Sequence, residues 1–413
     1  MTTGPPTRSH STAETYQIAE FELDVQCLEL RKHGQPVGIQ PLVFDVLRYL
    51  VERRDRVVFK DELFDNIWPQ RLVTESTLTA GIKRARQLLG DDGHAQQMIR
   101  TVHGRGYQFV GPVRIVGVDN NRPSATPTAI RFVPVRGDVR LAVAKTGSGP
   151  PLVKVANWLT HVEKDTDSPI WGHWVRDLSR RHTLIRYDSR GCGLSDRDLK
   201  GIAINNLDLW IEDLLRVVDS LGIERFSLLG LSQGGPVAVG FAARYPDRVD
   251  RLILHGTYAR GMNRRGDATQ VRQASLQVSL AEVGWAVPHS SFVEVFTKQM
   301  VPDAGEQEIR WFNELQRSTC DGETAGMLEG AMHDVDVCDL ASSLRAPALV
   351  THGIDEVAVP FDEGRRLASL IPDATLLSLE SKNHVLLASE PAWPEFVAAV
   401  EHFTGATGST SPA

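Results

Sequence analysis

The segment Leu228-Leu-Gly-Leu-Ser-Gln-Gly-Gly-Pro236 is the most informative stretch of this chain. The apolar run from Arg225 to Leu231 predicts a short buried strand, and Gly234 to Arg244 predicts a helix of small residues packed on a sheet. Ser232 lies between them in the spacing G-x-S-x-G, where bulk at either glycine would clash with a strained turn. Such a turn pushes the hydroxyl outward at the positive end of the helix. We therefore expect Ser232 to be a nucleophile at a strand-to-helix turn.

Length and composition indicate a globular protein of more than one domain. The chain has 413 residues and a net charge of -7, so two domains are expected. No apolar run is long enough to span a bilayer and the N-terminus lacks an apolar signal core, which predicts no membrane association and a cytoplasmic location. The four cysteines form no C-x-x-C pair, which argues against a disulfide framework or a zinc site.

The first part of the chain predicts a small α+β domain. Residues 1–15 are polar and rich in Pro, Ser and Thr, so we expect a disordered tail. Short alternating segments then predict an antiparallel meander, and helical spacing follows three times before a hairpin with a basic tip. These elements cover residues 16–36, 42–51, 60–68, 75–89 and 98–109.

The third predicted helix has a polar face with several cations. Its apolar positions recur with helical spacing at Leu78, Ile82, Ala85 and Leu89. The positions predicted to face outward include Thr77, Thr79, Lys83, Arg84 and Arg86. A solvated helix face is the ordinary explanation for such a pattern. The hairpin tip, with Arg105, adds a second cationic element that favours nucleic acid as the partner.

Residues 16–113 resemble the DNA-binding domain of OmpR/ToxR-type transcriptional regulators, a winged helix. The resemblance rests on the order of the elements, on Trp68, on Ile82-Lys-Arg-Ala-Arg86 and on Arg100-Thr-Val-His-Gly-Arg-Gly-Tyr107. It implies that the third helix enters the major groove of double-stranded DNA. Thr77, Thr79, Lys83, Arg84 and Arg86 would then face DNA, and Arg105 would sit on the wing. Winged helices of this type usually bind paired sites, which favours a homodimer, although no segment indicates the interface.

A polar, proline-containing linker is expected at 114–129, before a second domain at 130–405 and a tail at 406–413. Within the second domain, strand and helix patterns alternate as in a mostly parallel sheet covered by helices. The predicted strands are 130–135, 139–145, 152–156, 183–187, 226–231, 251–255, 348–352 and 375–379. Residues 258–336 do not alternate and are helix-prone and rich in aromatic residues, so we expect an inserted helical cap.

The second domain resembles the α/β-hydrolase family. The loop Tyr187-Asp-Ser-Arg-Gly-Cys-Gly-Leu-Ser-Asp196 carries the resemblance together with the turn at Ser232. It implies a catalytic acid after the strand that follows the cap and a histidine after the last strand, which gives Asp355 and His384. The histidine would take the serine proton, and the acid would orient the imidazole. Glu356, next to Asp355, and Asp188 are weaker candidates for the acid.

The resemblance also implies an oxyanion hole built from two backbone amides. One would belong to Gln233, the residue after the nucleophile. The other would come from the loop after strand 152–156, where many relatives have His-Gly and this chain has Asn157-Trp158. By position the second donor is Trp158. Asn157 would tolerate a positive φ if the loop requires one.

The predicted fold is therefore multidomain, with an N-terminal winged helix (α+β) followed by an α/β-hydrolase domain with a mostly parallel sheet, helices on both faces and a helical cap. The predicted function is a transcriptional regulator whose hydrolase domain binds and hydrolyses a small-molecule effector. Two alternatives remain: a hydrolase with an accessory DNA-binding module, and a non-catalytic receptor. No Gly-rich phosphate loop or metal-ligand cluster occurs in the sequence, so no cofactor and no metal are expected. Ester, thioester, lactone and carbon-carbon bond hydrolysis all remain open.

Overall fold

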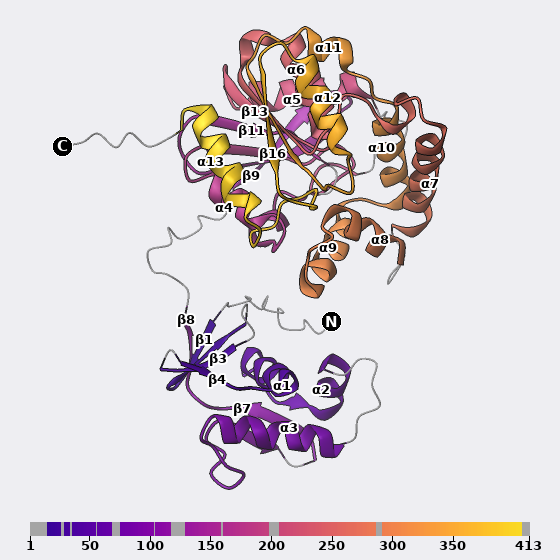
Figure 1. The fold of residues 1–413 in the computed structure, drawn as a ribbon. Helices are drawn as coiled ribbons and strands as arrows, with labels where there is room; N and C mark the ends of the chain where they lie inside the picture. The colour runs from indigo at the N-terminus through magenta and orange to yellow at the C-terminus, as the bar shows by residue number, and fades with distance from the viewer. Residues whose placement is uncertain are drawn as a thin grey trace, which may run out of the picture. The chain divides into compact units, whose positions relative to one another are not determined.

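In the computed structural model the chain forms two compact units, Met1–Ala125 and Thr126–Ala413, which we describe separately (Figure 1). The structure describes residues 15–25, 29–33, 35–54, 56–67, 75–102, 104–116, 129–157, 160–197, 206–285 and 291–406. Each unit has a hydrophobic core of its own. The two cores correspond to the two domains expected from the length of the chain.

The N-terminal unit contains a five-stranded antiparallel sheet in the order β4-β3-β2-β1-β8. Its first four strands are β1 (Thr15–Ile18), β2 (Phe21–Asp24), β3 (Glu29–Lys32) and β4 (Gln35–Val37), which confirms the predicted meander. The fifth strand, β8 (Val113–Val116), pairs with β1 and so occupies the first residues of the predicted linker. The rest of that linker, up to residue 128, and residues 1–14 of the predicted tail lie outside the described residues, whereas Thr15, the last residue of that tail, belongs to β1.

Three helices and a second sheet complete the N-terminal unit. The helices are α1 (Pro41–Glu52), α2 (Lys60–Ile67) and α3 (Glu75–Leu88). The second sheet contains β5 (Val58–Phe59), β6 (Ile99–Val102) and β7 (Gly106–Phe109), and its β6–β7 pair is the predicted hairpin. Apolar side chains at helical spacing on α1 and α3 fill the core, among them Val46, Leu47, Leu78, Ile82 and Ala85. The predicted end of the second helix, Trp68, lies outside the described residues.

Gly81 lies inside α3 on the buried side that faces α1. A methyl group at this position would meet Val46 Cγ2 at 3.8 Å, an ordinary van der Waals contact. Since glycine costs about 1 kcal/mol relative to alanine inside a helix, we expect Gly81→Ala to stabilise the N-terminal unit. Thermal unfolding of a fragment spanning residues 1–125 should show Tm raised by about 2–6 °C. An unchanged or lower Tm would show that the site does not accept a side chain.

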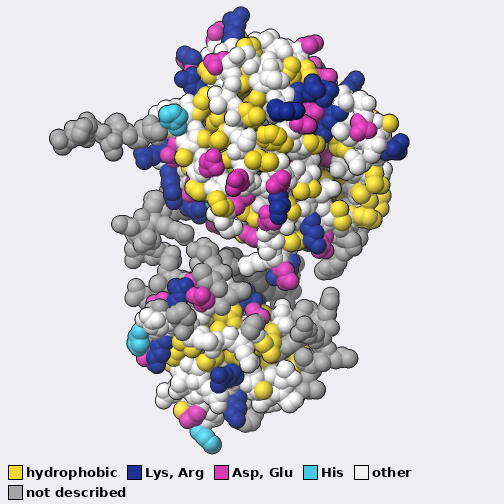
Figure 2. Space-filling view, viewed as in Figure 1, with side chains coloured by type: hydrophobic (Ala, Val, Ile, Leu, Met, Phe, Trp, Pro, Cys, Tyr) yellow, Lys and Arg dark blue, Asp and Glu magenta, His cyan; other side chains and the backbone are white. Residues whose placement is uncertain are grey.

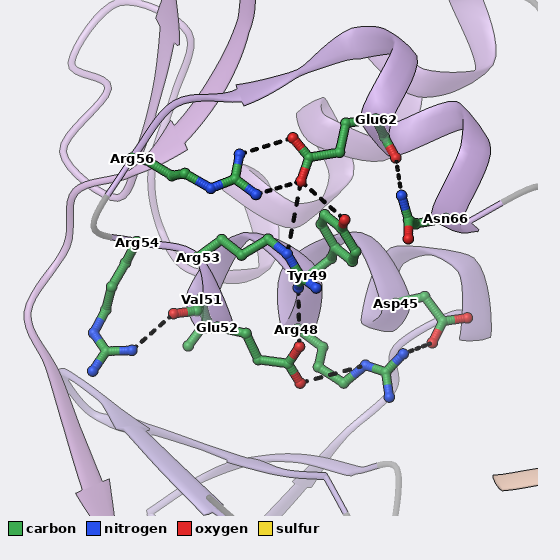
Figure 3. A network of polar contacts seen from close by, with 10 residues as sticks. All are labelled: Asp45, Arg48, Tyr49, Val51, Glu52, Arg53, Arg54, Arg56, Glu62 and Asn66. Atoms are coloured by element: carbon green, nitrogen blue, oxygen red, sulfur yellow. Dashed lines mark hydrogen bonds and ion pairs between the residues drawn. The ribbon is translucent and has the colours of Figure 1, made fainter. Parts of the chain in front are cut away.

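A network of charged side chains joins the end of α1 to α2 (Figure 3). Glu62 on α2 accepts hydrogen bonds from Arg56 at 2.5 and 2.8 Å and from the Tyr49 hydroxyl at 3.0 Å. Arg53 approaches the same carboxylate at 3.7 Å, and its guanidinium lies 3.6 Å from the centre of the Tyr49 ring. The hydrogen bond from Arg56 is the main cause that lowers the pKa of Glu62. The network therefore favours the ionised carboxylate.

Glu62→Gln tests the contribution of this network. A group with a lowered pKa in the folded state stabilises the fold above its unfolded pKa, and this stabilisation is lost as the pH falls through the folded pKa. Because the pair with Arg56 is partly exposed, we expect Glu62→Gln to cost only about 0.5–1 kcal/mol at pH 7. The difference from the original protein should shrink progressively as the pH falls below about 4, the ordinary pKa of glutamate. Urea unfolding of residues 1–125 at pH 7 and pH 3.5 measures both values, and an equal loss at both would exclude the electrostatic explanation.

The C-terminal unit is built on an eight-stranded sheet in the order β16-β15-β14-β13-β11-β12-β10-β9. Only the pairs that β10 forms with β9 and β12 are antiparallel. The strands are β9 (Ile130–Val135), β10 (Val139–Thr146), β11 (Pro151–Lys154), β12 (Thr183–Tyr187), β13 (Phe226–Leu231), β14 (Val249–His255), β15 (Ala348–Gly353) and β16 (Ala374–Leu379). All eight predicted strands are present. Every residue of β13 is buried, as expected for a central strand with a continuous apolar run.

Helices cover both faces of this sheet (Figure 1). On one side lie α4 (Gly172–Leu178) and α13 (Ala392–Thr404), which contact each other through Trp174 and Trp393. The other side carries α5 (Leu207–Ser220), α6 (Gly234–Arg244), α11 (Cys338–Ser342) and α12 (Phe361–Leu370). This arrangement confirms the predicted mostly parallel, helix-covered sheet.

The predicted cap is present between β14 and β15. It contains α7 (Ala268–Gly284), α8 (Ser291–Met300), α9 (Glu306–Thr319) and α10 (Gly322–Asp334). Helices α7 and α10 approach closely at Gly326, which has no side chain; a Cβ there would come within 2.3 Å of Glu282 on α7. No helix in the described part of the chain is both long and apolar enough to cross a membrane.

Candidate active site and DNA-binding surface

Ser232 occupies the turn between β13 and α6. Its φ is +51°, a left-handed conformation that non-glycine residues seldom adopt. Hydrogen bonds hold this strained residue on both sides. Its N–H donates to the His255 carbonyl at 3.0 Å, and its carbonyl accepts from the Gly235 N–H at 3.0 Å and from the Thr257 hydroxyl at 2.5 Å. The turn thus has the geometry that the sequence predicted.

Close packing explains the glycines around the turn. A Cβ at Gly230 would lie 2.8 Å from atoms of α6, and one at Gly234 would lie 3.2 Å from Val155. The tightest position is Gly235, one residue beyond the motif, where a Cβ would come within 1.9 Å of Thr257 Oγ1. Since Thr257 also bonds the serine carbonyl, Gly235 allows a contact that fixes the turn.

His384 lies in the loop after β16 and is almost completely buried. Its backbone N–H donates to the Met300 carbonyl at the end of α8, at 2.8 Å. Its ring Nδ1 lies 2.5 Å from Glu356 Oε1, close enough for a strong hydrogen bond. Both Ser232 and His384 line the same cavity. The structure therefore places the predicted serine and histidine at one site.

The carboxylate that contacts His384 belongs to Glu356 and not to Asp355. Glu356 is fully buried against the ring, whereas Asp355 is exposed and only its backbone N–H is bonded, to the Ser381 carbonyl at 3.2 Å. The turn after β15 directs these neighbouring side chains to opposite sides, so the prediction that Asp355 partners His384 is wrong. Gly256, with φ +52°, leaves the space for this pair, since a Cβ there would lie 3.1 Å from Glu356 and 3.2 Å from His384.

Three imidazoles surround the buried Glu356. Its Oε1 also accepts from the Val359 N–H at 3.1 Å, and His352 Nε2 lies 3.3 Å from its Oε2. Burial alone would raise the pKa of Glu356, but His384, His352 and His255 outweigh burial and lower it. The carboxylate is therefore charged at neutral pH, as the stabilisation of a protonated His384 requires.

Asp188, the other weaker candidate for the catalytic acid, instead stabilises backbone near the site. Its carboxylate accepts from the backbone N–H groups of Val162 and Leu194 at 3.0 and 2.9 Å. Burial raises its pKa to about 8. These bonds fix the loop after β12, and Asp188 does not contact His384 within the described residues.

The predicted oxyanion loop is described only in part. Gln233 is buried at the start of α6, where its side chain donates to Glu329 on α10 at 3.2 Å, while Trp158 lies outside the described residues. Asn157 does not have positive φ, so tolerance of that conformation does not explain its presence. Its side-chain oxygen instead accepts a 2.5 Å hydrogen bond from the buried Lys154, which orients the loop.

A cavity of about 460 Å³ lies under the cap, within the size range of small-molecule sites. Ser232, Gln233 and His384 line it from the side of the sheet, and α7, α8 and α10 line it from the cap. Its apolar lining residues Leu276, Phe292, Val295 and Val357 are 46–59% exposed, so they mark its mouth. Hydrophobic side chains also gather on the visible surface of α7 (Figure 2).

In the N-terminal unit, α3 presents an exposed face. Thr79, Lys83 and Arg84 are exposed and Thr77 is partly buried. Arg105 is exposed in the turn between β6 and β7. Five of the six predicted DNA-contacting residues therefore retain at least partial access to solvent.

Arg86 does not belong to this face. It is buried, and its guanidinium donates to the Ile99 carbonyl at 3.0 and 2.6 Å and to the Thr101 hydroxyl at 2.8 Å. These bonds tie α3 to the hairpin. The prediction that Arg86 faces DNA is wrong, because it lies four residues after Ile82 on the buried stripe of α3.

Asp91 has a similar structural role in the loop before the hairpin. Its carboxylate accepts from the backbone N–H groups of Asp92, Gln97, Met98 and Ile99 at 2.9–3.1 Å. Burial raises its pKa, but these hydrogen bonds outweigh burial and lower it. The position of the hairpin relative to α3 thus depends on two buried charges, Arg86 and Asp91.

Comparison with known proteins identifies two domains in the chain. Residues 34–109 match the family described as "Transcriptional regulatory protein, C terminal". Residues 165–391, more than half of the chain, match the family described as "alpha/beta hydrolase fold". Both matches confirm the resemblances seen in the sequence.

Similar proteins match about three fifths to two thirds of the chain. The "AB hydrolase superfamily protein YisY" of Bacillus subtilis is 25% identical over 61% of this chain and 91% of its own length. The "Pimeloyl-[acyl-carrier protein] methyl ester esterase" of Nitrosomonas europaea is 26% identical over 60% of this chain and 94% of its own. The crystal structure of a hydrolase from Pseudomonas aeruginosa covers 67% of this chain and 98% of its own, with 25% identity and a TM-score of 0.56.

Proposed function

Because the chain belongs to the α/β-hydrolase fold family and also carries a DNA-binding domain of transcriptional regulators, we propose that it is a regulator that binds and hydrolyses its small-molecule effector. The observation that carries this proposal is that His384, whose ring contacts the buried Glu356, lines the same cavity as Ser232. A charged acid, an imidazole and a serine in a strained turn are the parts of an acyl-transfer site.

In the proposed reaction Ser232 Oγ attacks the carbonyl carbon of the effector while His384 Nε2 takes the hydroxyl proton. The resulting oxyanion is stabilised by the backbone N–H of Gln233 at the start of α6, with Trp158 proposed as the second donor. His384 then returns the proton to the leaving group, and water hydrolyses the acyl-enzyme by the same steps. Glu356 keeps the Nδ1 proton directed toward its Oε1 and stabilises the imidazolium.

Esters, thioesters and lactones fit this chemistry, since each has an activated carbonyl and a leaving oxygen or sulfur. The Nitrosomonas europaea relative is by its name a methyl ester esterase, which supports an ester among these classes. The exposed apolar residues at the cavity mouth favour an effector with an apolar part.

A covalent serine probe tests the catalytic part of the proposal. A fluorophosphonate should form one adduct, located on Ser232 by peptide mass spectrometry. Labelling should slow by roughly 10²–10⁴-fold in His384→Ala, because the general base is lost. Ser279→Ala, an exposed serine on α7, is the matched control and should label normally. Absence of labelling at Ser232 would refute a catalytic serine.

The DNA-binding part of the proposal rests on the exposed cations of α3 and the hairpin. We expect Lys83→Ala and Arg84→Ala each to weaken binding to a random-sequence duplex by about tenfold, since each removes one contact to a phosphate. Each should also reduce by about one the slope of log affinity against log salt concentration. Fluorescence anisotropy at several salt concentrations measures both. Arg31→Ala, on β3, removes the same charge elsewhere and should change little. Equal losses in all three variants would exclude a specific DNA-binding face.

A further inference from the structure

Arg265 is a cation with a largely buried side chain in the wall of the cavity that Ser232 also lines. It directly follows the short helix η3 (Met262–Arg264), and only 8% of its side chain is exposed. Its guanidinium lies 5.5 Å from the centre of the Tyr258 ring, which also lines the cavity. Burial lowers the pKa of Arg265, yet arginine stays charged in proteins. A charge in this position requires compensation.

The protein supplies only part of that compensation. The Nε of Arg265 donates to the Arg260 carbonyl at 3.0 Å, and its Nη1 lies 3.4 Å from Gln270 Oε1. The carboxylate nearest to Arg265 is Glu363, at 3.9 Å. The same Glu363 oxygen accepts a hydrogen bond from Arg260 at 3.0 Å. Two guanidinium groups therefore share one carboxylate, and Arg265 has the weaker contact.

Among the described residues that line the cavity, the acid is Glu329. Its Oε2 accepts from Gln233 at 3.2 Å, and its Oε1 lies 3.3 Å from His333 Nε2. Glu329 and Arg265 both lie near Tyr258, since Glu329 raises the pKa of the Tyr258 hydroxyl and Arg265 lowers it. The structure nevertheless describes no ion pair between Glu329 and Arg265. The charge of Arg265 is thus left facing the space where a ligand would lie.

We propose that Arg265 binds a carboxylate of the effector, at a position remote from the carbonyl that Ser232 attacks. A guanidinium can hold both oxygens of a carboxylate in parallel, and the low-dielectric wall strengthens such a bond. The apolar lining of the cavity would contact the chain between the two groups. This inference rests on the proposed function and narrows it: the effector is an ester, thioester or lactone of an acid that carries a second, free carboxylate.

The test compares two esters that differ at one end. Mono-p-nitrophenyl adipate carries a free carboxylate where p-nitrophenyl hexanoate has a methyl group. Monoesters from succinate to suberate, each with its neutral partner, vary the length of the chain between the ester and the free carboxylate. We expect the original protein to have kcat/KM about 10–100-fold higher for the best-fitting carboxylate ester than for its neutral partner. Arg265→Gln should reduce the ratio to about one, and Arg265→Lys should leave an intermediate value, since lysine keeps the charge without the planar fork.

Two controls identify the cause of any change. Arg272→Gln removes an exposed arginine of α7 and should leave both rates unchanged. Glu329→Gln removes the opposite charge from the cavity wall and should keep or raise the ratio, whatever it does to the absolute rates. A fall of the ratio in Glu329→Gln equal to that in Arg265→Gln would indicate a general disturbance of the cavity and overturn the assignment to Arg265.

A binding measurement separates this inference from the proposed function. Calorimetry on Ser232→Ala with monomethyl adipate and methyl hexanoate reports the carboxylate preference without turnover. A preference that disappears in Ser232→Ala/Arg265→Gln supports the assignment even if no ester is hydrolysed. Conversely, hydrolysis of neutral esters with a ratio near one throughout the series would overturn the carboxylate site and leave the hydrolase function intact.

Discussion

Glu356→Gln is expected to lower kcat for p-nitrophenyl butyrate by about 10⁴-fold, because glutamine neither stabilises the protonated His384 nor fixes its tautomer. Asp355→Asn, which changes the neighbouring acid in the same way, is expected to leave kcat within about threefold, since exposed substitutions away from the reacting groups have small effects. KM should change little in either variant, because neither side chain lines the cavity. The pair of variants thus isolates the acid that the structure places beside His384.

Circular dichroism provides the control, because Glu356 is fully buried and its replacement could also disturb the fold. An unfolded Glu356→Gln protein would make its activity uninformative, and Gly256→Ala would then serve as the second variant, since its added methyl group would press on Glu356 and His384. A large loss in Asp355→Asn together with a small loss in Glu356→Gln would reverse the assignment.

Ser232→Ala is expected to have the largest effect, a loss of about 10⁵–10⁶-fold in kcat, because it removes the proposed nucleophile. Binding of the effector should persist, since every other residue that lines the cavity is unchanged. Once an ester that the protein hydrolyses is known, addition of that ester should change the DNA affinity of the original protein only until the ester is consumed. The same change in DNA affinity should persist in Ser232→Ala, which does not hydrolyse the ester. Fluorescence anisotropy over time measures this difference.

The same variant separates a regulator that consumes its effector from a pure receptor. For a receptor, the response of DNA affinity to the ester would have the same time course in both proteins. For an enzyme whose winged helix only localises it, DNA affinity would not respond to the ester in either. Ser279→Ala controls for handling of the protein and should match the original.

The architecture could be predicted from the sequence because its signals are local. The strands of the C-terminal sheet are short apolar runs, and the turn at Ser232 needs glycines at fixed distances. The cap could be located because the alternation of strand and helix patterns is interrupted between two core strands. In contrast, the sequence predicts a linker over most of β8, because this strand is defined by its pairing with β1, which is distant in the sequence.

The candidate site could be predicted only to the level of loops. The sequence placed an acid after β15, but Asp355 and Glu356 are adjacent carboxylates, and the direction of the turn decides which one is buried. Arg86 differs, because the sequence contains a sign of its burial: Arg86 follows Ile82 by four residues, which places both on the buried side of α3. Its charge favoured the exposed interpretation, whereas the carbonyl of Ile99 satisfies it inside. Three contacts of Arg265 are local, with Tyr258, Arg260 and Gln270, but its nearest carboxylate, Glu363, is distant in the sequence, so the sequence alone does not show how the charge is compensated.

The backbone of His384 is bonded to the last residue of α8, because the N–H groups of His384 and Val385 both donate to the Met300 carbonyl, at 2.8 and 3.2 Å. Met300 also lines the cavity. The cap therefore supports the backbone of the proposed proton acceptor as well as enclosing the cavity, so substitutions at the C-terminal end of α8 are expected to affect the position of His384 together with the shape of the cavity.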